Sequence, residues 1–231
     1  REEILHYRDV YKIEFIFFWA DTFFAYSPKE FDAFCEMYSD IKLPFWCQTR
    51  AETIRIKPER IKQLKDLGLY WISFGLEHGN EKFRADVINR ACSNDMMVKA
   101  FDTVNDYDVP LTVNNIIGFP DETRELAFDT VNLNRRFKAN SRSCRIFMPY
   151  HGTALHTYSV KKGYIEPDII CPSNNDKAVL NMSAMSQSEI TGISRTFNMY
   201  VNFPENRWPE IREAEAQTPE GDKKFEELRI E

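Results

Sequence analysis

The sequence has no hydrophobic run long enough to cross a membrane. A membrane helix needs about 18 consecutive apolar residues, whereas the longest apolar run is the short segment Phe15–Ala20. We also recognise no signal peptide, and residues 1–5 read like the inside of a helix rather than the start of a protein. We therefore expect no membrane span, and we interpret the sequence as part of a longer chain.

Closely spaced cysteines are also missing. The cysteines are scattered and odd in number, and none forms a CxxC pair: they are Cys35, Cys47, Cys92, Cys144 and Cys171. Isolated thiols are typical of a reduced compartment, so the sequence predicts a cytoplasmic protein without a disulfide framework. The spacing of His151 and His156 does not suit one helical face, so we predict no metal site from these residues.

The sequence also lacks an excess of positive charge. Acidic residues outnumber basic ones, 36 to 30, which gives a formal net charge of −6. General nucleic-acid binders carry a basic excess, so we expect no nucleic-acid partner. Apolar residues make up 43% of the sequence and aromatic residues 14%, which excludes a disordered chain. The length allows one large domain, or one domain with an appendage.

Strand-like and helix-like segments alternate up to Tyr150. β-Branched and aromatic residues indicate the strands, while apolar spacing and N-cap residues such as Ser27 indicate the helices. The predicted strands are 11–18, 44–49, 69–75, 110–117 and 144–148, and the predicted helices are 27–39, 58–67, 80–89, 94–107 and 122–138. A helix between successive strands predicts a parallel sheet. We interpret the aromatic run 15–24 as core.

The pattern changes after Tyr150. A short helix is predicted over 154–162, followed by an irregular stretch and by a helix that opens at Ser186 with a capping box. The segment from Glu205 onwards is rich in charge, so we interpret it as an exposed helix or a fraying terminus rather than core. The sequence thus divides into a βα part, 1–153, and a helical extension, 154–231.

Polar residues cluster where the predicted strands end. They are Trp19-Ala20-Asp21 after the first strand, Arg50 after the second, Glu77 and His78 after the third, Asn114 and Gly118 at the fourth, and Pro149-Tyr150 after the fifth. Parallel α/β folds bind ligands at the carboxyl ends of their strands. The pattern therefore predicts a binding site.

These residue types suit a ligand with a ribose, a base and an amino-acid end. Glu77 could accept ribose hydroxyls, and the guanidinium groups of Arg50 and Arg90 suit a carboxylate. Asn114 offers a donor and an acceptor, and Gly118 permits close backbone approach. Each has a structural alternative: Glu77 as a helix N-cap, Arg50 in an ion pair with Glu52 or Asp21, and Arg90 as a solvated charge.

The same residues carry a resemblance to a known family. The segments FFWADTF (17–23), WCQTR (46–50), ISFGLEHGNEKFR (72–84), NNIIGFPDET (114–123) and FMPYHGT (147–153), together with Arg90, resemble the radical S-adenosylmethionine (SAM) superfamily. The match is most similar to the branch whose members carry an upstream cobalamin-binding domain. It implies a partial (β/α)6 TIM-type barrel of parallel strands, with about five strands present over 1–153 and a C-terminal helical extension.

The resemblance also implies cofactors and partners. Family members hold a [4Fe–4S] cluster that cleaves SAM reductively to a 5′-deoxyadenosyl radical, and some use cobalamin for methyl transfer to an unactivated carbon. It implies a small organic substrate and an electron donor such as flavodoxin or ferredoxin. The cluster motif CxxxCxxC is absent from this sequence, and the family places it just ahead of the position of Arg1.

The resemblance assigns residues to the parts of SAM. It places Ala20 and Asp21 at the methionine amino group, Arg50 and Glu77 at polar groups of the ribose or methionine moiety, Arg90 at the carboxylate, Asn114 at the ribose, and Ile117, Met148 and Pro149 around adenine. No catalytic residue is assigned.

Two other functions stay open at this point. The chain could be a non-catalytic remnant of the superfamily that binds a nucleotide or a partner protein. It could also be a conventional parallel α/β enzyme that uses Glu77 and His78 as acid and base.

Overall fold

A computed structural model describes residues 1–231 except for 21, 55–57 and 231. The described chain forms two compact units. Unit 1 comprises Arg1–Leu76, Cys92–Asn114 and Phe137–Arg142, and unit 2 comprises Glu77–Ala91, Asn115–Arg136 and Ser143–Glu231. Because the chain passes between the units several times, neither is a continuous segment. The predicted boundary between 153 and 154 stays a prediction.

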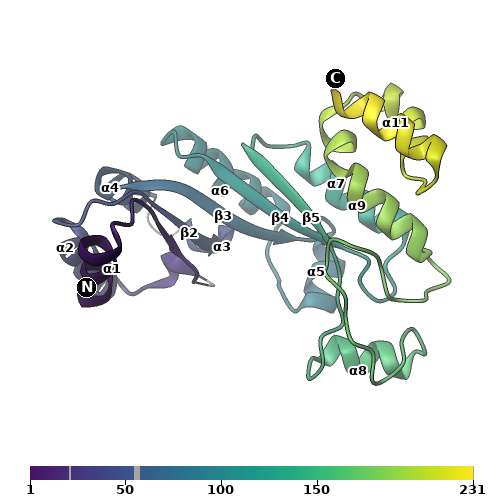
Figure 1. Ribbon diagram of the computed structural model, residues 1–231, viewed down its shortest axis with the longest axis horizontal. Helices are drawn as coiled ribbons and strands as arrows, with labels where there is room; N and C mark the ends of the chain where they lie inside the picture. Colours follow the sequence, from purple (N-terminus) through teal and green to yellow (C-terminus); the bar gives the residue numbers. More distant parts are fainter. Residues whose placement is uncertain (21, 55–57, 231) are drawn as a thin grey trace. The chain divides into compact units, whose positions relative to one another are not determined.

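Five parallel strands form one open sheet in the order β1-β2-β3-β4-β5 (Figure 1). They are β1 (Ile16–Phe18), β2 (Phe45–Arg50), β3 (Leu69–Glu77), β4 (Leu111–Ile117) and β5 (Ser141–Ile146). The spatial order follows the chain order, as expected for right-handed βαβ units laid side by side. The sheet and the helical C-terminal part confirm the predicted partial barrel of about five strands.

Helices fill the gaps between strands. Those before and between the strands are α1 (Glu2–Tyr11), α2 (Pro28–Tyr38), α3 (Ala51–Ile54), α4 (Glu59–Leu67), α5 (Glu81–Ile88), α6 (Asn94–Asp106) and α7 (Arg124–Asn134). Those after β5 are α8 (Ala154–Lys161), α9 (Gln187–Asn202), α10 (Trp208–Ala214) and α11 (Pro219–Ile230), and two short 3-10 helices lie at Phe23–Ala25 and Glu205–Arg207. The capping boxes predicted at Ser27 and Ser186 are both present. None of the helices in the described parts of the chain is long and apolar enough to span a membrane.

Two strand predictions were displaced. The first strand begins at Ile16 rather than at residue 11, because α1 runs to Tyr11 and Lys12 ends it in a left-handed conformation with φ 56°. The fifth strand begins at Ser141, three residues earlier than predicted. The backbone N–H of Asn140 donates to the Leu111 carbonyl, and the Asn140 side chain accepts from the Leu111 N–H. These two bonds hold the chain beside β4 at Asn140, so β5 begins before the apolar residues that indicated a strand in the sequence.

The core of unit 1 lies on one face of the sheet. Phe45 and Cys47 from β2 and Ile72 and Phe74 from β3 are completely buried there. Helices cover this face, as the contact of the Phe74 ring with that of Phe101 on α6 shows, with centroids 5.2 Å apart. Part of the aromatic run 15–24 joins this core, since Phe23 and Phe24 are buried.

Two hydrophobic clusters lie in the described part of unit 2. The first joins the end of β4 and the segment after β5 to α9, through residues such as Ile117, Met148 and Ile190. The second joins α7 and α9 to the last two helices, through Val131, Phe197, Ile211, Ala214 and Leu228.

The charged C-terminal segment was wrongly predicted to lie outside the core. It is helical, but Ile211 and Ala214 are completely buried and Leu228 is 3% exposed. Charge dominates the composition of this segment, whereas Ile211, Ala214 and Leu228 pack into the second cluster. The composition therefore concealed a narrow apolar stripe.

Leu228 and Ile230 provide a matched test of this stripe. Leu228→Ala should lower the free energy of unfolding by about 2–5 kcal/mol, because it leaves a cavity in a packed cluster. Ile230→Ala should change it by less than about 0.5 kcal/mol, because Ile230 is 82% exposed in the same helix. Urea unfolding followed by circular dichroism would measure both. Equal effects of the two substitutions would show that α11 does not pack as described.

Candidate functional site

Glu77, the last residue of β3, has an unusual backbone conformation. Its φ of 68° lies in the left-handed region, which a residue with a side chain rarely adopts. The carboxylate lies 3.6 Å from the guanidinium of Arg90, measured from Oε1 to Nη1. The Arg90 side chain is 9% exposed and that of Glu77 is 27% exposed. Two residues that were predicted separately thus meet within unit 2, and the Glu77 side chain is partly open to solvent. Backbone strain of this kind is concentrated at functional sites.

His78, the next residue, is completely buried. Its Nδ1 accepts the backbone N–H of Asn80 at 3.1 Å, and its Nε2 lies 3.0 Å from Glu122 Oε1. Since Nδ1 accepts a hydrogen bond, the ring carries its proton on Nε2 and donates it to the carboxylate. His78 therefore orients the loop and has no access to a substrate, which contradicts its use as an acid or base.

Glu122 holds the loop that follows β4. Its Oε2 accepts the backbone N–H of Gly118 at 2.5 Å and that of Phe119 at 2.8 Å, while Oε1 accepts from His78. The carboxylate is completely buried, so it depends on these three donors in place of water. One side chain thereby joins the loop after β3 to the loop after β4.

The rest of the LEHGNEKFR segment packs this loop onto helices α5 and α7. Asn80 caps α5 by accepting from the Phe83 N–H, and its amide donates to Asp129 Oδ2 at 2.8 Å. A Cβ on Gly79 would lie 2.2 Å from the Asp129 carbonyl oxygen, so only glycine fits. Arg84, completely buried, donates to the His78 carbonyl. The N-cap of α5 is therefore Asn80 and not Glu77.

Asp121 ties the loop after β4 to the α8 region. The hydroxyls of Tyr158 and Tyr164 both donate to its carboxylate, and Lys162 Nζ lies 3.9 Å away. Burial alone would raise the pKa of Asp121, but the two phenol donors and the lysine outweigh it and hold the pKa below its ordinary value. The loop after β4 is thus fixed on this side as well.

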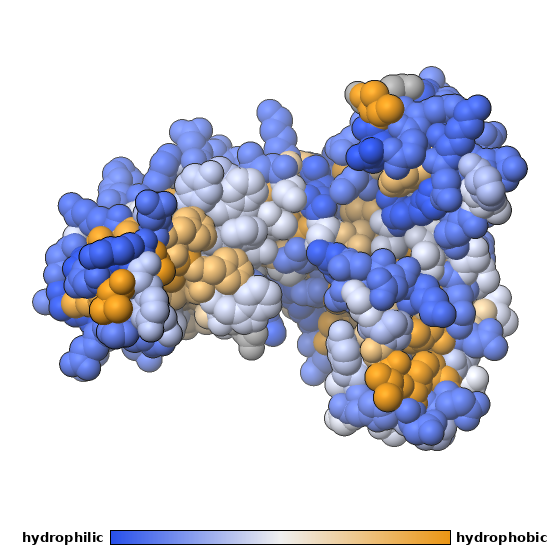
Figure 2. Space-filling view, in the orientation of Figure 1, coloured by the Kyte–Doolittle hydropathy of each residue, from blue (hydrophilic) through white to orange (hydrophobic). Residues whose placement is uncertain are grey.

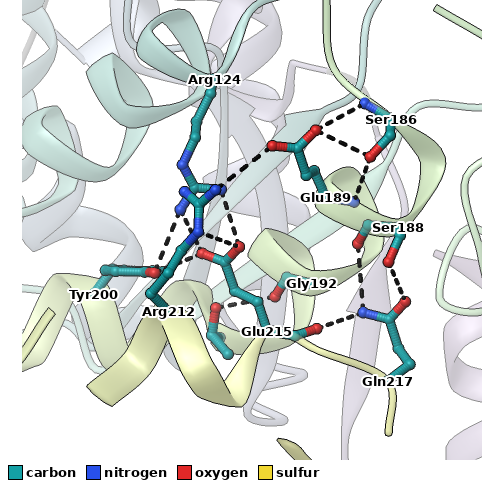
Figure 3. A network of polar contacts seen from close by, with 10 residues as sticks. Arg124, Ser186, Ser188, Glu189, Gly192, Tyr200, Arg212, Glu215 and Gln217 are labelled. Atoms are coloured by element: carbon teal, nitrogen blue, oxygen red, sulfur yellow. Dashed lines mark hydrogen bonds and ion pairs between the residues drawn. The ribbon is translucent and has the colours of Figure 1, made fainter. Parts of the chain in front are cut away.

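Helix α7 begins with an arginine held by the C-terminal helices (Figure 3). Both nitrogens of the Arg124 fork bond to Glu215, at 2.9 and 2.5 Å, and the Tyr200 hydroxyl donates to Glu215 Oε1 at 2.5 Å. Burial, and then the bond to Glu215, raise the pKa of Tyr200, which keeps it a donor. The network extends through Arg212 to Glu189, the capping-box residue of α9. The C-terminal helices therefore brace the start of α7.

Unit 1 holds the other polar candidates. Arg50 is exposed at the end of β2, in register with Gly75 of β3. Asn114 on β4 donates its amide N–H to Ser73 Oγ at 2.9 Å. Ala20 is half-buried after β1, and its N–H bonds to the Phe18 carbonyl. Asp21 lies outside the described residues. The roles of these residues stay predictions.

The predicted adenine residues belong to the core of unit 2. Ile117 is completely buried, Met148 is 5% exposed and Pro149 is buried. The Ile117 carbonyl accepts the Phe147 N–H, and the Pro149 carbonyl lies 3.5 Å from the Cys171 thiol. Because these side chains lie in the core, the backbone of the three residues is the part suited to contact the adenine ring. This role also stays a prediction.

The described residues do not fit an iron–sulfur cluster. None of them forms a group of three or more histidine, cysteine or acidic side chains that could hold a metal ion. Burial raises the pKa of the Cys47 and Cys144 thiols, which disfavours the thiolate form that a metal needs. Cluster ligands would have to come from outside the described residues.

Comparison with known protein families identifies the family of this chain. The protein-family model described as the radical SAM superfamily matches residues 1–133, which is more than half of the chain. The chain therefore belongs to the radical SAM superfamily, which confirms the resemblance and supports an enzyme.

Individual relatives agree with this placement. A protein of Pyrococcus horikoshii named as an uncharacterized methyltransferase is 27% identical over 158 residues, which cover 68% of this chain and 33% of the relative. The structure of coproporphyrinogen III oxidase (HemN) from Escherichia coli, a radical SAM enzyme, is similar with a TM-score of 0.61 and 11% identity over 88% of this chain and 44% of that one. The cobalamin-dependent SAM radical enzyme OxsB is similar with a TM-score of 0.56 and 11% identity, over 97% of this chain and 39% of that one. The chain thus spans about a third of the curated relative.

Sequence reasoning missed Glu122 and Arg84. Both look like ordinary surface charges in the sequence, Glu122 at the start of a helix and Arg84 in a charged one. The only signal was the position of Glu122 four residues after Gly118, where a carboxylate can reach back to loop N–H groups.

Glu122→Gln tests the loop anchor. The carboxylate accepts three hydrogen bonds, whereas glutamine replaces one of its oxygens with an NH2 group that would face an N–H donor. The free energy of unfolding should therefore fall by about 1–3 kcal/mol. Glu125→Gln, at an exposed position one turn further on, should change it by less than about 1 kcal/mol. Chemical unfolding would compare the two, and equal losses would contradict the anchor.

Proposed function

We propose that this chain is the SAM-binding barrel part of a radical SAM iron–sulfur enzyme that cleaves SAM reductively. The observation that carries the proposal is the Glu77–Arg90 pair. The Glu77 side chain is partly exposed and its backbone is in a left-handed conformation, and the buried contact between His78 and Glu122 fixes the loop that follows it. A site built so rigidly suits a ligand that must be placed accurately for one reaction.

The chemistry of the pair suits the polar groups of SAM. A partly exposed carboxylate can accept two ribose hydroxyls or the methionine ammonium, and a buried guanidinium can hold a carboxylate in planar geometry. Ala20, Asp21, Arg50 and Asn114, with the backbone at Ile117, Met148 and Pro149, would complete the contacts that the family motifs imply. The SAM-bound cluster would supply the one-electron chemistry, while these residues bind and orient SAM and exclude water.

We further propose a cobalamin-dependent methyl transfer to an unactivated carbon of a small organic molecule. Two similarities support it: the relative from Pyrococcus horikoshii is named as a methyltransferase, and OxsB is cobalamin-dependent. The electron would come from a donor such as flavodoxin or ferredoxin. Cobalamin, the reductant and a cytoplasmic location stay predictions.

The experiment uses protein expressed from its complete coding sequence, reconstituted anaerobically with iron and sulfide. It should bind SAM and release 5′-deoxyadenosine after reduction with dithionite. Glu77→Gln should weaken SAM binding at least tenfold in calorimetry, because the amide loses the charge and one acceptor. Glu81→Gln is a matched control at an exposed position in the first turn of α5, and it should bind like the unmodified protein.

Failure of the unmodified protein to bind SAM would reject the proposal. SAM binding without 5′-deoxyadenosine would favour the second candidate, a non-catalytic nucleotide-binding remnant of the superfamily. The third reading, with Glu77 and His78 as an acid and base pair, is wrong, because His78 is completely buried and bonded to Glu122.

A further inference from the structure

The two faces of the sheet in unit 1 differ sharply. In β2 the residues alternate: Phe45, Cys47 and Thr49 are buried, whereas Trp46 and Gln48 are only partly buried. Parallel sheets are normally covered on both faces. The face that carries Trp46 and Gln48 is the less covered of the two, so it is a candidate binding surface.

Aromatic side chains form a continuous row across that face. Phe17 of β1 is in register with Trp46 of β2, which is in register with Trp71 of β3. Ring centroids are 5.0 Å apart for the first pair and 5.8 Å apart for the second, and Trp19 lies 5.0 Å from Phe17. Phe17 is 36% exposed and Trp19 is 79% exposed, so part of the aromatic run predicted as core is at the surface. Figure 2 shows hydrophobic side chains at the surface over these N-terminal elements.

The next row along the strands is polar and uncharged. Gln48 is in register with Ser73, which accepts a hydrogen bond from Asn114. Two residues further on, Arg50 is in register with Gly75. Successive rows on one face are separated by about 7 Å, since each residue rises about 3.3 Å. An aromatic row, a neutral polar row and a charged end thus follow one another along the strands.

The aromatic row is fixed in place and carries no charge. The Trp71 indole donates to Thr112 Oγ1 at 2.8 Å, which holds its ring against that of Trp46. All described side chains in the two rows are neutral: Phe17, Trp46, Trp71 and Thr112 in one, and Gln48, Ser73 and Asn114 in the other. A charged ligand would lose its hydration here without gaining an opposite charge. A flat apolar ligand would instead stack on the rings of this row, of which Trp46 and Trp71 are partly buried, and could bond to the amides of the next row.

We propose that this aromatic face is the substrate subsite, and that it takes a flat, uncharged and largely apolar molecule. The inference rests on the proposed function: Asn114, which is proposed to contact SAM, lies in the row next to the aromatic one. A ligand stacked on Trp46 then has its edge within one row, about 7 Å, of that cofactor contact. The substrate class follows from the neutral aromatic surface together with its distance from the charged strand end.

Two fluorescent probes that share a ring system but differ in charge test this assignment. Protein from the complete coding sequence should bind neutral N-phenylnaphthylamine at least tenfold more tightly than anionic anilinonaphthalene sulfonate. Trp46→Ala should weaken binding of the neutral probe at least tenfold, and Trp46→Phe should retain it within threefold, because the second variant keeps a ring in the row. Tyr11→Ala removes a ring that is 65% exposed on α1, and it should have no effect.

The outcomes separate the subsite from the proposed function. SAM affinity measured on the same proteins should be unchanged in Trp46→Ala. Equal binding of both probes, no binding of the neutral probe, or neutral-probe binding that is insensitive to Trp46→Ala would each overturn the subsite. The first would remove the charge selectivity, and the second would show that another part of the protein covers this face. Absence of SAM binding in the unmodified protein would instead overturn the proposed function and the identification of the apolar ligand as a substrate.

Discussion

The buried carboxylate of Glu122 is the interaction on which the candidate site depends. Charge that is removed from water must be compensated, and here three protein donors compensate it. Because those donors come from the loops after β3 and after β4, neither loop can move without leaving the charge unsatisfied. The position of the adjacent Glu77 follows from this constraint, as does the conformation of the Gly118 turn.

Further contacts support the same loops from outside. Asp121 is held by two tyrosines near α8, and Arg124 is held by Glu215 ahead of α11. The C-terminal helices are therefore a structural brace of the loop after β4, whatever else they bind. The Arg124–Glu215 pair makes two hydrogen bonds through the arginine fork. It therefore fixes the orientation of the two segments as well as their proximity, which hydrophobic contact alone would not do.

Strand alternation explains how one sheet serves two purposes. Residues at odd positions of β2 pack under the helices, and those at even positions form the open face. The apolar half of the sheet stabilises the fold, while the aromatic and amide rows remain for a ligand. A strand that was apolar on both faces, as is usual in parallel sheets, would leave no place for such rows.

The amino-acid sequence by itself determined the βα alternation, the capping boxes at Ser27 and Ser186 and the presence of polar residues at strand ends. These features depend on local spacing and on side chains that bond to nearby backbone, which a linear pattern records. The tertiary structure decided that Glu122 and Arg84 are buried, that Leu228 belongs to a core, and that Phe17, Trp46 and Trp71 form one row. Each of these depends on partners distant in the sequence, and burial changes the meaning of a charge or a ring completely.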